Sequence, residues 1–333
     1  MHHDITVQKG AKAMKNKKLL PLLLSLTLLL SACVPQGQPV SGDVFAMNSY
    51  MRLTAYGPRA SAAVEQGLAA LTALDATLST TDEGSEIYAY NRGDTAALSP
   101  ATQALVDEGL ALGARTGGAL DITIYSLVRA WGFTTDSNRV PAQAELDALL
   151  AAPSDQLDLG ALGKGYAGDV LAAQMRDAGV NSALLTLSGN IHCVGAKPDG
   201  TPWNIAIQDP NDPAAYLGAL PVVNQAVVTS GGYERYFEQD GKTYHHIIDP
   251  ATGYPADSGL LSVTIVADSG TLADGLSTAL FVMGLEGALA HYEAYGDFEA
   301  ILVTEEQHVY LTPGLTHTFE LLSNDYQLVE ILP

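Results

Sequence analysis

Apolar positions along the chain change their spacing several times, and this spacing predicts a mixture of helices and strands. Residues 59–78 repeat apolar side chains at helical intervals, with Val64 and Leu71 on the same face. Residues 260–268 are rich in β-branched side chains, which is typical of a strand, and the apolar residues 271–283 that follow are expected to be helical. Because helices and strands alternate without a regular strand–helix–strand repeat, we expect an α+β fold rather than a doubly wound sheet.

Shorter signals predict the remaining elements. Strands are predicted at residues 47–57, 182–187, 203–208, 222–230, 298–304 and 309–312, together with a hairpin that turns at Asp240-Gly241. Helices are predicted from Pro100, from Pro141 and over residues 163–178, and Gly179 closes the last of these. Ser99 is a suitable N-cap for the helix that begins at Pro100.

A leucine-rich run, residues 19–30, follows three lysines that begin at Lys15. The run is shorter than the roughly 20 apolar residues that span a bilayer, so the pattern is that of a secretory signal peptide. It ends in Leu-Ser-Ala-Cys33, which resembles the lipobox of bacterial lipoproteins, in which the signal is cleaved before the cysteine and the cysteine is acylated. The alternative is an ordinary signal peptide with a chance cysteine.

This signal divides the chain into a signal peptide with an upstream extension (1–32), a tether (33–43) and a folded domain (44–333). The protein is then exported and anchored in a membrane, in the periplasm or on the outer face of the cytoplasmic membrane, and no later segment is expected to span it. With Cys33 acylated, Cys193 has no disulfide partner and is expected to be a buried core residue.

Acidic residues far outnumber basic ones, with 37 Asp and Glu against 16 Lys and Arg and a formal net charge of −21. Such a surface repels nucleic acid and anionic headgroups, which excludes a nucleic-acid partner. The chain is also long enough to bury a large core, in one domain or two closely packed ones.

Four glycines surround Lys164 within residues 158–169, where a predicted helix begins. Glycines let the backbone approach a ligand closely and a helix N-terminus attracts anions, so a bound phosphate is one interpretation. The spacing differs from a Walker A loop, and Gly165 follows the lysine in place of Ser or Thr. A plain glycine-rich turn is the alternative.

Asp274 and Thr278 lie four residues apart at the start of an apolar predicted helix, so their side chains share one helical face. One carboxylate and one hydroxyl form part of a ligand set for a hard cation, and Mg²⁺ usually completes its shell with water and phosphate oxygens. The alternative is a solvated helix start, where Asp274 complements the helix dipole.

His246 and Asp249 are expected at the end of the predicted hairpin, before a tight turn that contains Pro250 and Gly253. His245 completes a histidine pair, but no Cys or third His lies nearby to form a zinc site, so zinc is discarded. The chain also lacks a Gly-x-Ser-x-Gly motif, which disfavours a hydrolase of that type.

Taken in order, these segments resemble the ApbE family of FAD:protein FMN transferases over residues 47–284. The matching motifs are Met47-Asn-Ser; Ser79-Thr-Thr with Ser85-Glu-Ile and Asn91; Gly117-Gly-Ala-Leu-Asp121-Ile-Thr123 with Leu127 and Trp131-Gly-Phe; residues 158–169; Ser188-Gly-Asn190; Trp203; Thr229-Ser-Gly-x-Tyr233; His246-Ile-Ile-Asp-Pro-x-Thr-Gly253; and Ala273-Asp274-x-x-x-Thr278. Each is weak alone, but this many in one order are specific.

The resemblance implies mixed sheets with packed helices and an FAD cleft between the two halves of the domain. It implies Mg²⁺-dependent transfer of FMN from FAD to a Thr or Ser hydroxyl of an acceptor protein, with release of AMP. Acceptors of such proteins are subunits of membrane redox complexes such as the Na⁺-pumping quinone reductase (Nqr) and Rnf. Two alternatives use the same site: an FAD pyrophosphatase that yields FMN and AMP, and a non-catalytic FAD-binding lipoprotein.

The resemblance also assigns site residues by their position in the motifs. The FAD-binding positions are Met47, Ala119, Leu120, Asp121, Asp158, Lys164, Ser188, Gly189, Asn190, Ser230, His246 and Ile247. The metal positions are Ala161 through its carbonyl, Asp274, Ser277 and Thr278, and the catalytic candidates are His246 and Asp274. Ser277 replaces a second Asp of some relatives, and Thr81 replaces a frequent aromatic residue, so flavin packing is expected to be weaker or to come from another side chain such as Tyr88.

Overall fold

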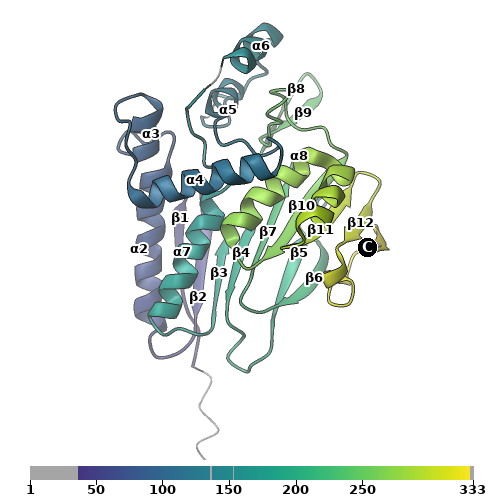
Figure 1. The fold of residues 1–333 in the computed structure, drawn as a ribbon. Coiled ribbons are helices and arrows are strands. Elements are labelled where there is room, and N and C mark those ends of the chain that lie inside the picture. The colour runs from purple at the N-terminus through teal and green to yellow at the C-terminus, as the bar shows by residue number, and fades with distance from the viewer. Residues whose placement is uncertain (1–36, 136, 153, 331–333) are drawn as a thin grey trace, which may run out of the picture. The chain divides into compact units, whose positions relative to one another are not determined.

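The structure is a computed structural model that describes residues 37–135, 137–152 and 154–330. A nine-stranded sheet forms its centre, in the order β1-β2-β3-β4-β7-β10-β11-β12-β14 (Figure 1). The strands are β1 (Val40–Ala46), β2 (Ser49–Ala55), β3 (Ala183–Leu187), β4 (Asn190–Val194), β7 (Ala226–Gly231), β10 (Leu260–Ala267), β11 (Glu299–Thr304), β12 (His308–Leu311) and β14 (Gln327–Glu330). Neighbouring strands are antiparallel except β12 and β14, which run parallel.

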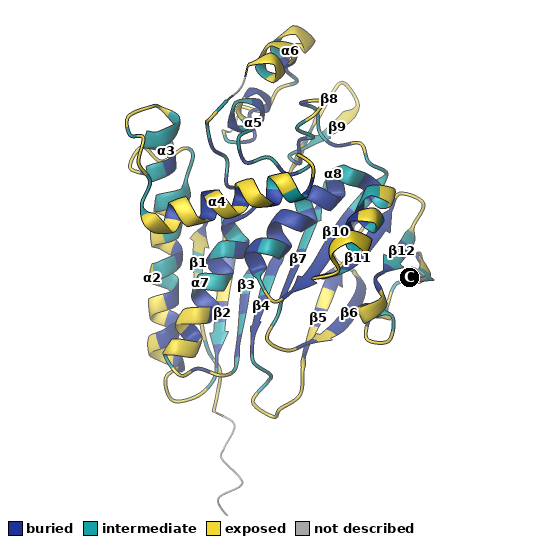
Figure 2. Cartoon of the chain, viewed as in Figure 1, coloured by how far each residue is buried: buried dark blue, intermediate teal, exposed yellow. Residues whose placement is uncertain are grey.

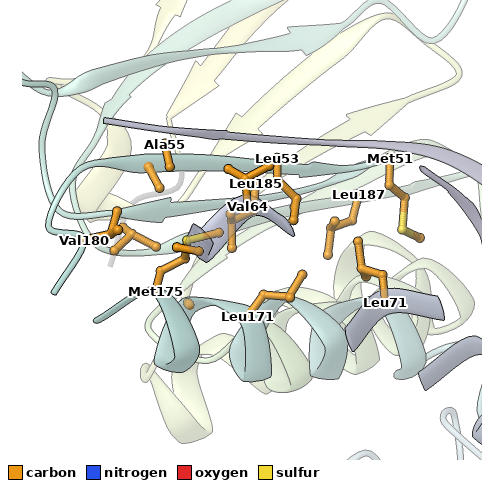
Figure 3. Close-up of a cluster of buried hydrophobic side chains, with 14 of the residues drawn as sticks. Met51, Leu53, Ala55, Val64, Leu71, Leu171, Met175, Val180, Leu185 and Leu187 are labelled. Carbon is orange, nitrogen blue, oxygen red and sulfur yellow. The ribbon is translucent and has the colours of Figure 1, made fainter. Parts of the chain in front are cut away.

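Three helices cover one face of this sheet: α2 (Ala60–Leu78), α7 (Gly163–Asp177) and α8 (Gly270–Tyr295). Their apolar stripes pack on the strands: in the core cluster of Figure 3, Leu171 lies beneath Leu53 and Leu71 lies beneath Leu187. A fourth helix, α4 (Pro100–Arg115), lies against α8. The periodic apolar positions of the sequence are therefore the ones that bury the helix layer.

A small sheet of β5 (Trp203–Gln208), β6 (Tyr216–Val222) and β13 (Glu320–Leu321) covers the opposite face of the central strands. Successive residues of β7 show the two sides: Val227 packs with Trp203 of the small sheet, and Val228 packs with Leu276 of α8. Figure 2 shows that the central strands are largely buried, and because both of their faces are covered, most of their side chains are apolar.

The remaining elements gather around Trp131. The hairpin of β8 (Tyr236–Gln239) and β9 (Lys242–His245) packs with α5 (Tyr125–Trp131) and α6 (Gln143–Ala151). The indole N–H of Trp131 donates to the carbonyl of Gly253 at 2.7 Å, and its ring contacts three aromatic side chains, those of Phe237, Tyr244 and Tyr254. Two further short helices lie in the described part of the chain, α3 (Glu86–Asn91) and η2 (Pro313–Leu315).

Several predictions from local signals are confirmed. The fold is α+β, α4 begins at Pro100 with Ser99 as its N-cap, and β8 turns into β9 at Asp240-Gly241 with φ values of 53° and 75°. Cys193 is buried, at 2% exposure, and burial raises the pKa of its thiol to about 12. The predicted signal peptide, its cleavage site and Cys33 lie outside the described residues.

The single strand predicted at residues 47–57 is wrong. The structure has a hairpin here, in which β1 begins at Val40, within the expected tether, and pairs with β2. Met47 and Asn48 form the two-residue turn, with φ values of 49° and 56°. Two consecutive positive φ angles are what a tight hairpin with right-handed twist requires, and Asn adopts this conformation more readily than most residues.

Predictions at the strand-rich end of the chain are partly wrong. The strand predicted at 222–230 is two strands, because β6 ends at Val222 and β7 starts at Ala226 after a turn in which Asn224 has a φ of 59°. A further strand, β14, follows the strand predicted over 309–312 and pairs with β12. The elements with no counterpart among the predicted ones are β4, β13, β14, α3, α5, η2 and the part of β6 before Val222.

Helix α8 is longer than the predicted 271–283, and its backbone leaves helical geometry at Gly284, where φ is 73° and ψ is −179°. Its length and mean hydropathy of 1.3 are sufficient for a membrane span, so the expectation that no segment after the signal is long and apolar enough for one is wrong. The helix nevertheless packs on β7, β10 and α7, and the stretch is 56% buried within the protein. It is therefore a core helix of this fold.

Candidate functional site

A cleft with a volume of about 940 Å³ lies where hairpin turns and helix N-termini meet. Its lining includes the β1–β2 turn, the β3–β4 turn, the starts of α7 and α8, and the segment after β9. The predicted site residues in this lining are Met47, Ala119, Leu120, Asp121, Asp158, Ala161, Lys164, Ser188, Gly189, Asn190, Ser230, His246, Ile247, Asp274 and Thr278. The structure thus brings them together, and the individual roles assigned to them stay predictions.

Asn91, at the end of α3, fixes the segment that leads into the glycine-rich loop. Its Nδ2 donates to the carbonyl of Leu157 at 2.8 Å, and its Oδ1 accepts the backbone N–H of the same residue at 2.6 Å. Asp158 follows, with its backbone N–H bonded to the carbonyl of Ile122 at 2.8 Å. Burial raises the pKa of the Asp158 carboxyl, and the Gly160 amide that donates to it at 2.8 Å acts in the opposite direction.

Helix α7 begins inside the cleft lining, at Gly163. Leu162 stands at its N-cap position and provides no side-chain hydrogen bond. Lys164 is half-buried and also lines the cleft. A helix N-terminus beside an ammonium group favours an anion, because both the amide dipoles and the lysine charge attract it.

Asp274 lies in the first turns of α8 and points toward the start of α7. Its Oδ2 accepts the backbone N–H of Gly165 at 2.8 Å. Burial raises the pKa of the Asp274 carboxyl, while Lys164 and the neighbouring amides lower it. The ammonium and the amides therefore oppose the burial effect that disfavours the carboxylate form.

Thr278, one turn after Asp274, also lines the cleft, whereas Ser277 does not. The Ser277 hydroxyl is fully buried, donates to the carbonyl of Asp274 at 2.8 Å and lies 2.8 Å from the hydroxyl of Ser230. Its predicted place in the metal site therefore lacks support from the geometry, because this oxygen is occupied inside the protein.

The donor set at this end of the cleft suits a hard cation. Asp274 supplies a carboxylate, Thr278 a hydroxyl and Ala161 a backbone carbonyl, all on residues that line the same cleft. In the part of the chain that the structure describes, no three His, Cys, Asp or Glu residues are grouped to hold a metal ion. A cation bound here would need oxygens from water or from a phosphate, which is the usual situation for Mg²⁺.

His246 follows β9 and is held by the backbone of Arg235. The carbonyl of Arg235 lies 3.1 Å from His246 Nδ1 and accepts the backbone N–H of His246 at 3.0 Å. Burial in the cleft wall, together with the charges of Arg235 and Lys164, lowers the pKa of His246 to about 3. His245 faces away from the cleft, with its Nε2 3.0 Å from the carbonyl of Ala256.

Three charged residues of the lining are absent from the predicted site residues: Asp75, Glu234 and Arg235. Glu234 and Arg235 directly follow the matched Thr229-Ser-Gly-x-Tyr233 motif, and this position is the signal by which they could have been found. Burial raises the pKa of Glu234, whose carboxyl lies against Gly189: a Cβ on that glycine would be 2.8 Å from Glu234 Oε1.

Aromatic side chains other than the expected one line the cleft. Thr81 is in the lining and Tyr88 is not, so the suggestion that Tyr88 packs against a flavin lacks support from the geometry of the cleft. Tyr88 instead lies near Arg92, whose guanidinium is 3.4 Å from its hydroxyl. The aromatic residues that do line the cleft are Tyr50, Phe133, Tyr233 and Tyr236.

Residues 47–302 match the family model described as the ApbE family. A protein named FAD:protein FMN transferase from Salmonella typhimurium is 34% identical over 284 residues, which cover 76% of this chain and 81% of that protein. A protein of the same name from Klebsiella pneumoniae is 36% identical over 232 residues, covering 64% and 72% respectively.

Solved structures agree with the sequence comparison. The ApbE protein of Thermotoga maritima superposes with a TM-score of 0.78 at 29% identity, over 84% of this chain and 99% of that chain. The apo form of the flavinyl transferase ApbE from Pseudomonas stutzeri gives a TM-score of 0.70 at 31% identity, over 82% and 93%. With the family model matched over most of its length and the fold shared with solved members, the chain belongs to the ApbE family.

Proposed function

We propose that this chain, an FAD:protein FMN transferase of the ApbE family, uses Mg²⁺ to transfer FMN from FAD to a Thr or Ser hydroxyl of an acceptor protein. The hydroxyl oxygen attacks the phosphorus on the FMN side of the diphosphate. The bond from that phosphorus to the bridging oxygen breaks, and AMP leaves with that oxygen. The observation that carries this proposal is that a single cleft gathers Lys164, Asp274, Thr278 and His246 from separate elements.

Groups at the starts of α7 and α8 would stabilise the negative charge on the phosphoryl oxygens. Asp274, Thr278 and the carbonyl of Ala161 would hold Mg²⁺, which when bound offsets the negative charge that develops on the phosphoryl oxygens. Lys164 adds a positive charge beside the N-terminal amides of α7, so a diphosphate placed there meets donors that are already oriented.

The acceptor hydroxyl must lose a proton, and His246 is suited to receive it. A carbonyl only accepts hydrogen bonds, so the contact with Arg235 places the proton of the neutral imidazole on Nδ1 and leaves a lone pair on Nε2. Burial, aided by the two nearby cations, keeps the ring neutral in the free protein. A bound diphosphate neutralises those cations, which raises the basicity of Nε2 when the substrate is present.

The proposed setting is the outer side of a membrane. A leader with the pattern of a lipoprotein signal, ending just before Cys33, supports export and acylation. Lipid at Cys33 would keep the cleft near membrane redox subunits of the Nqr or Rnf type, the acceptors that we propose. If the proposal is correct, replacement of Cys33 with Ser abolishes incorporation of labelled palmitate and releases the protein into the soluble fraction.

The decisive experiment incubates the purified protein with FAD, Mg²⁺ and a candidate acceptor domain. Flavin fluorescence on the acceptor band, with one AMP released for each label, supports transfer. AMP and free FMN without a labelled acceptor would show an FAD pyrophosphatase, in which water takes the place of the hydroxyl. Tight FAD binding without any turnover would show a flavin-binding lipoprotein.

A further inference from the structure

Asp169 lies on α7, yet its carboxylate is bonded to the start of α8. Oδ1 accepts the backbone N–H of Gly270 at 2.7 Å, and Oδ2 accepts the backbone N–H of Thr271 at 2.9 Å. The hydroxyls of Ser269 and Thr271 also donate to Oδ2, at 3.1 and 2.9 Å. A carboxylate that satisfies the free N-terminal amides of a helix both caps that helix and complements its dipole.

The two helices hold each other in a reciprocal way. Asp274 of α8 accepts the amide of Gly165 near the start of α7, and Asp169 of α7 accepts the amides at the start of α8. The backbones touch between these bonds, because a Cβ on Gly165 would lie 2.1 Å from the carbonyl oxygen of Gly270. The position of Asp274 relative to Lys164 is therefore set by two crossed hydrogen-bonded caps.

His192 of β4 fills the space beneath this crossing. It is only 3% exposed, and its Nδ1 is 3.8 Å from Asp169 Oδ1. A Cβ on Gly168 would be 1.9 Å from its Nε2, and a Cβ on Gly270 would be 2.0 Å from its Cε1. The imidazole thus packs against both helices and against the carboxylate that joins them.

We infer that Asp169 is a positioning residue for the cation site: by capping α8 from α7, with His192 packed beneath, it fixes where the Asp274 carboxylate meets Mg²⁺. The inference rests on the proposed function, because it assumes a cation at Asp274. Oδ2 of Asp274 already accepts a hydrogen bond from Gly165, so the cation must bind one of the lone pairs of the carboxylate that this bond leaves free. The orientation of the carboxylate then follows from the placement of α8, and outer-shell partners of this kind affect metal affinity strongly.

The test measures Mg²⁺ binding by calorimetry with FAD present, and Mg²⁺-dependent transfer, in the Asp169→Asn variant. We expect the half-saturating Mg²⁺ concentration to rise about tenfold or more, with kcat at saturating Mg²⁺ near the wild-type value. A merely structural loss would lower the folded fraction without changing this concentration. Asp177→Asn is the matched control, since it makes the same charge change at the exposed end of α7.

Each outcome has a distinct meaning. Wild-type Mg²⁺ affinity in Asp169→Asn would overturn the inference while leaving the proposed function intact. A wild-type protein that neither binds Mg²⁺ nor needs it would overturn the proposed cation site, and the inference with it. If Asp169→Asn does not fold, Thr271→Val replaces it, because this change removes one hydrogen bond to Asp169 and keeps the backbone cap. We then expect a smaller rise in the half-saturating Mg²⁺ concentration. The absence of any rise would refute the inference.

Discussion

His246 Nδ1 and the backbone carbonyl of Arg235 lie 3.1 Å apart, and this contact determines the tautomer of the histidine. With the proton on Nδ1, the Nε2 lone pair is free for a substrate proton. The pKa of about 3 means that the ring is neutral in the free protein throughout the physiological pH range. Protonation of His246 is therefore not expected to inactivate the free enzyme until the pH approaches that value.

Replacement of Arg235 with Gln removes one of the two cations that lower the pKa of His246. We expect the proton affinity of the imidazole to rise, by about tenfold or more, since a nearby like charge typically shifts a pKa by this amount. An NMR pH titration of labelled histidine measures it directly. Arg129→Gln, the same change at an exposed position on α5, serves as the control. Equal titration curves for Arg235→Gln and wild type would refute the electrostatic explanation.

Asp274→Ala removes the carboxylate of the proposed cation site. We expect acceptor labelling to fall by at least about a hundredfold, the loss typical when a group that stabilises transition-state charge is removed. FAD binding, followed by fluorescence quenching, is expected to persist because most of the cleft lining is unchanged. Asp268→Ala, at an exposed position before α8, is the control. Undiminished labelling by Asp274→Ala, with EDTA also harmless, would rule out the metal assignment.

Local signals in the sequence predicted those features that depend on a few adjacent residues. Ser99 caps α4, Asp240-Gly241 turns a hairpin, and the glycine-rich loop ends at the start of α7, because each requires only neighbouring backbone groups. The turn at Met47-Asn48 carries a weak sequence signal because Met is not a typical turn residue, so β1 and β2 were predicted as a single strand.

Contacts between distant segments could not be predicted in the same way. Ser277 and Thr278 are adjacent in the sequence, but Ser277 is buried beside Ser230 of β7 whereas Thr278 lines the cleft. Likewise, Tyr326 donates to Asp209 at 2.6 Å and accepts from Asn211 at 2.9 Å, which ties a cleft-lining loop to the C-terminal region. No periodicity or motif links residues so far apart.

Because α7 and α8 are in close contact, alanine substitution at two glycines of α7 is expected to change the free energy of unfolding by very different amounts. A Cβ on Gly165 would lie 2.1 Å from the carbonyl oxygen of Gly270, whereas a Cβ on Gly163 meets nothing within 4 Å. We expect Gly165→Ala to lower the free energy of unfolding by about 1–3 kcal/mol or more, as overpacking does. Gly163→Ala is expected to change it by less than about 1 kcal/mol. Equal stability of the two variants in urea denaturation would contradict the close approach of the helices.

The buried imidazole of His192 is expected to make the free energy of unfolding depend on pH. Burial, aided by Arg176 and opposed by Asp169, lowers its pKa from 6.5 to about 4 in the folded state. The unfolded chain therefore binds this proton at a higher pH, so the contribution of neutral His192 is fully present above pH 6.5 and is lost as the pH falls toward 4. A difference of this size corresponds to roughly 3 kcal/mol in the free energy of unfolding.

His192→Gln removes this titration, so its free energy of unfolding is expected to fall less steeply between pH 6.5 and 4 than that of the wild type. The slope, measured by urea denaturation at several pH values, is the informative quantity, because the substitution also changes packing against Gly168 and Gly270. His246 contributes a slope of the same sign and remains in both proteins. His317→Gln, at an exposed position, is expected to retain the wild-type slope. If His192→Gln keeps that slope as well, His192 is not the buried neutral group beneath the α7–α8 crossing.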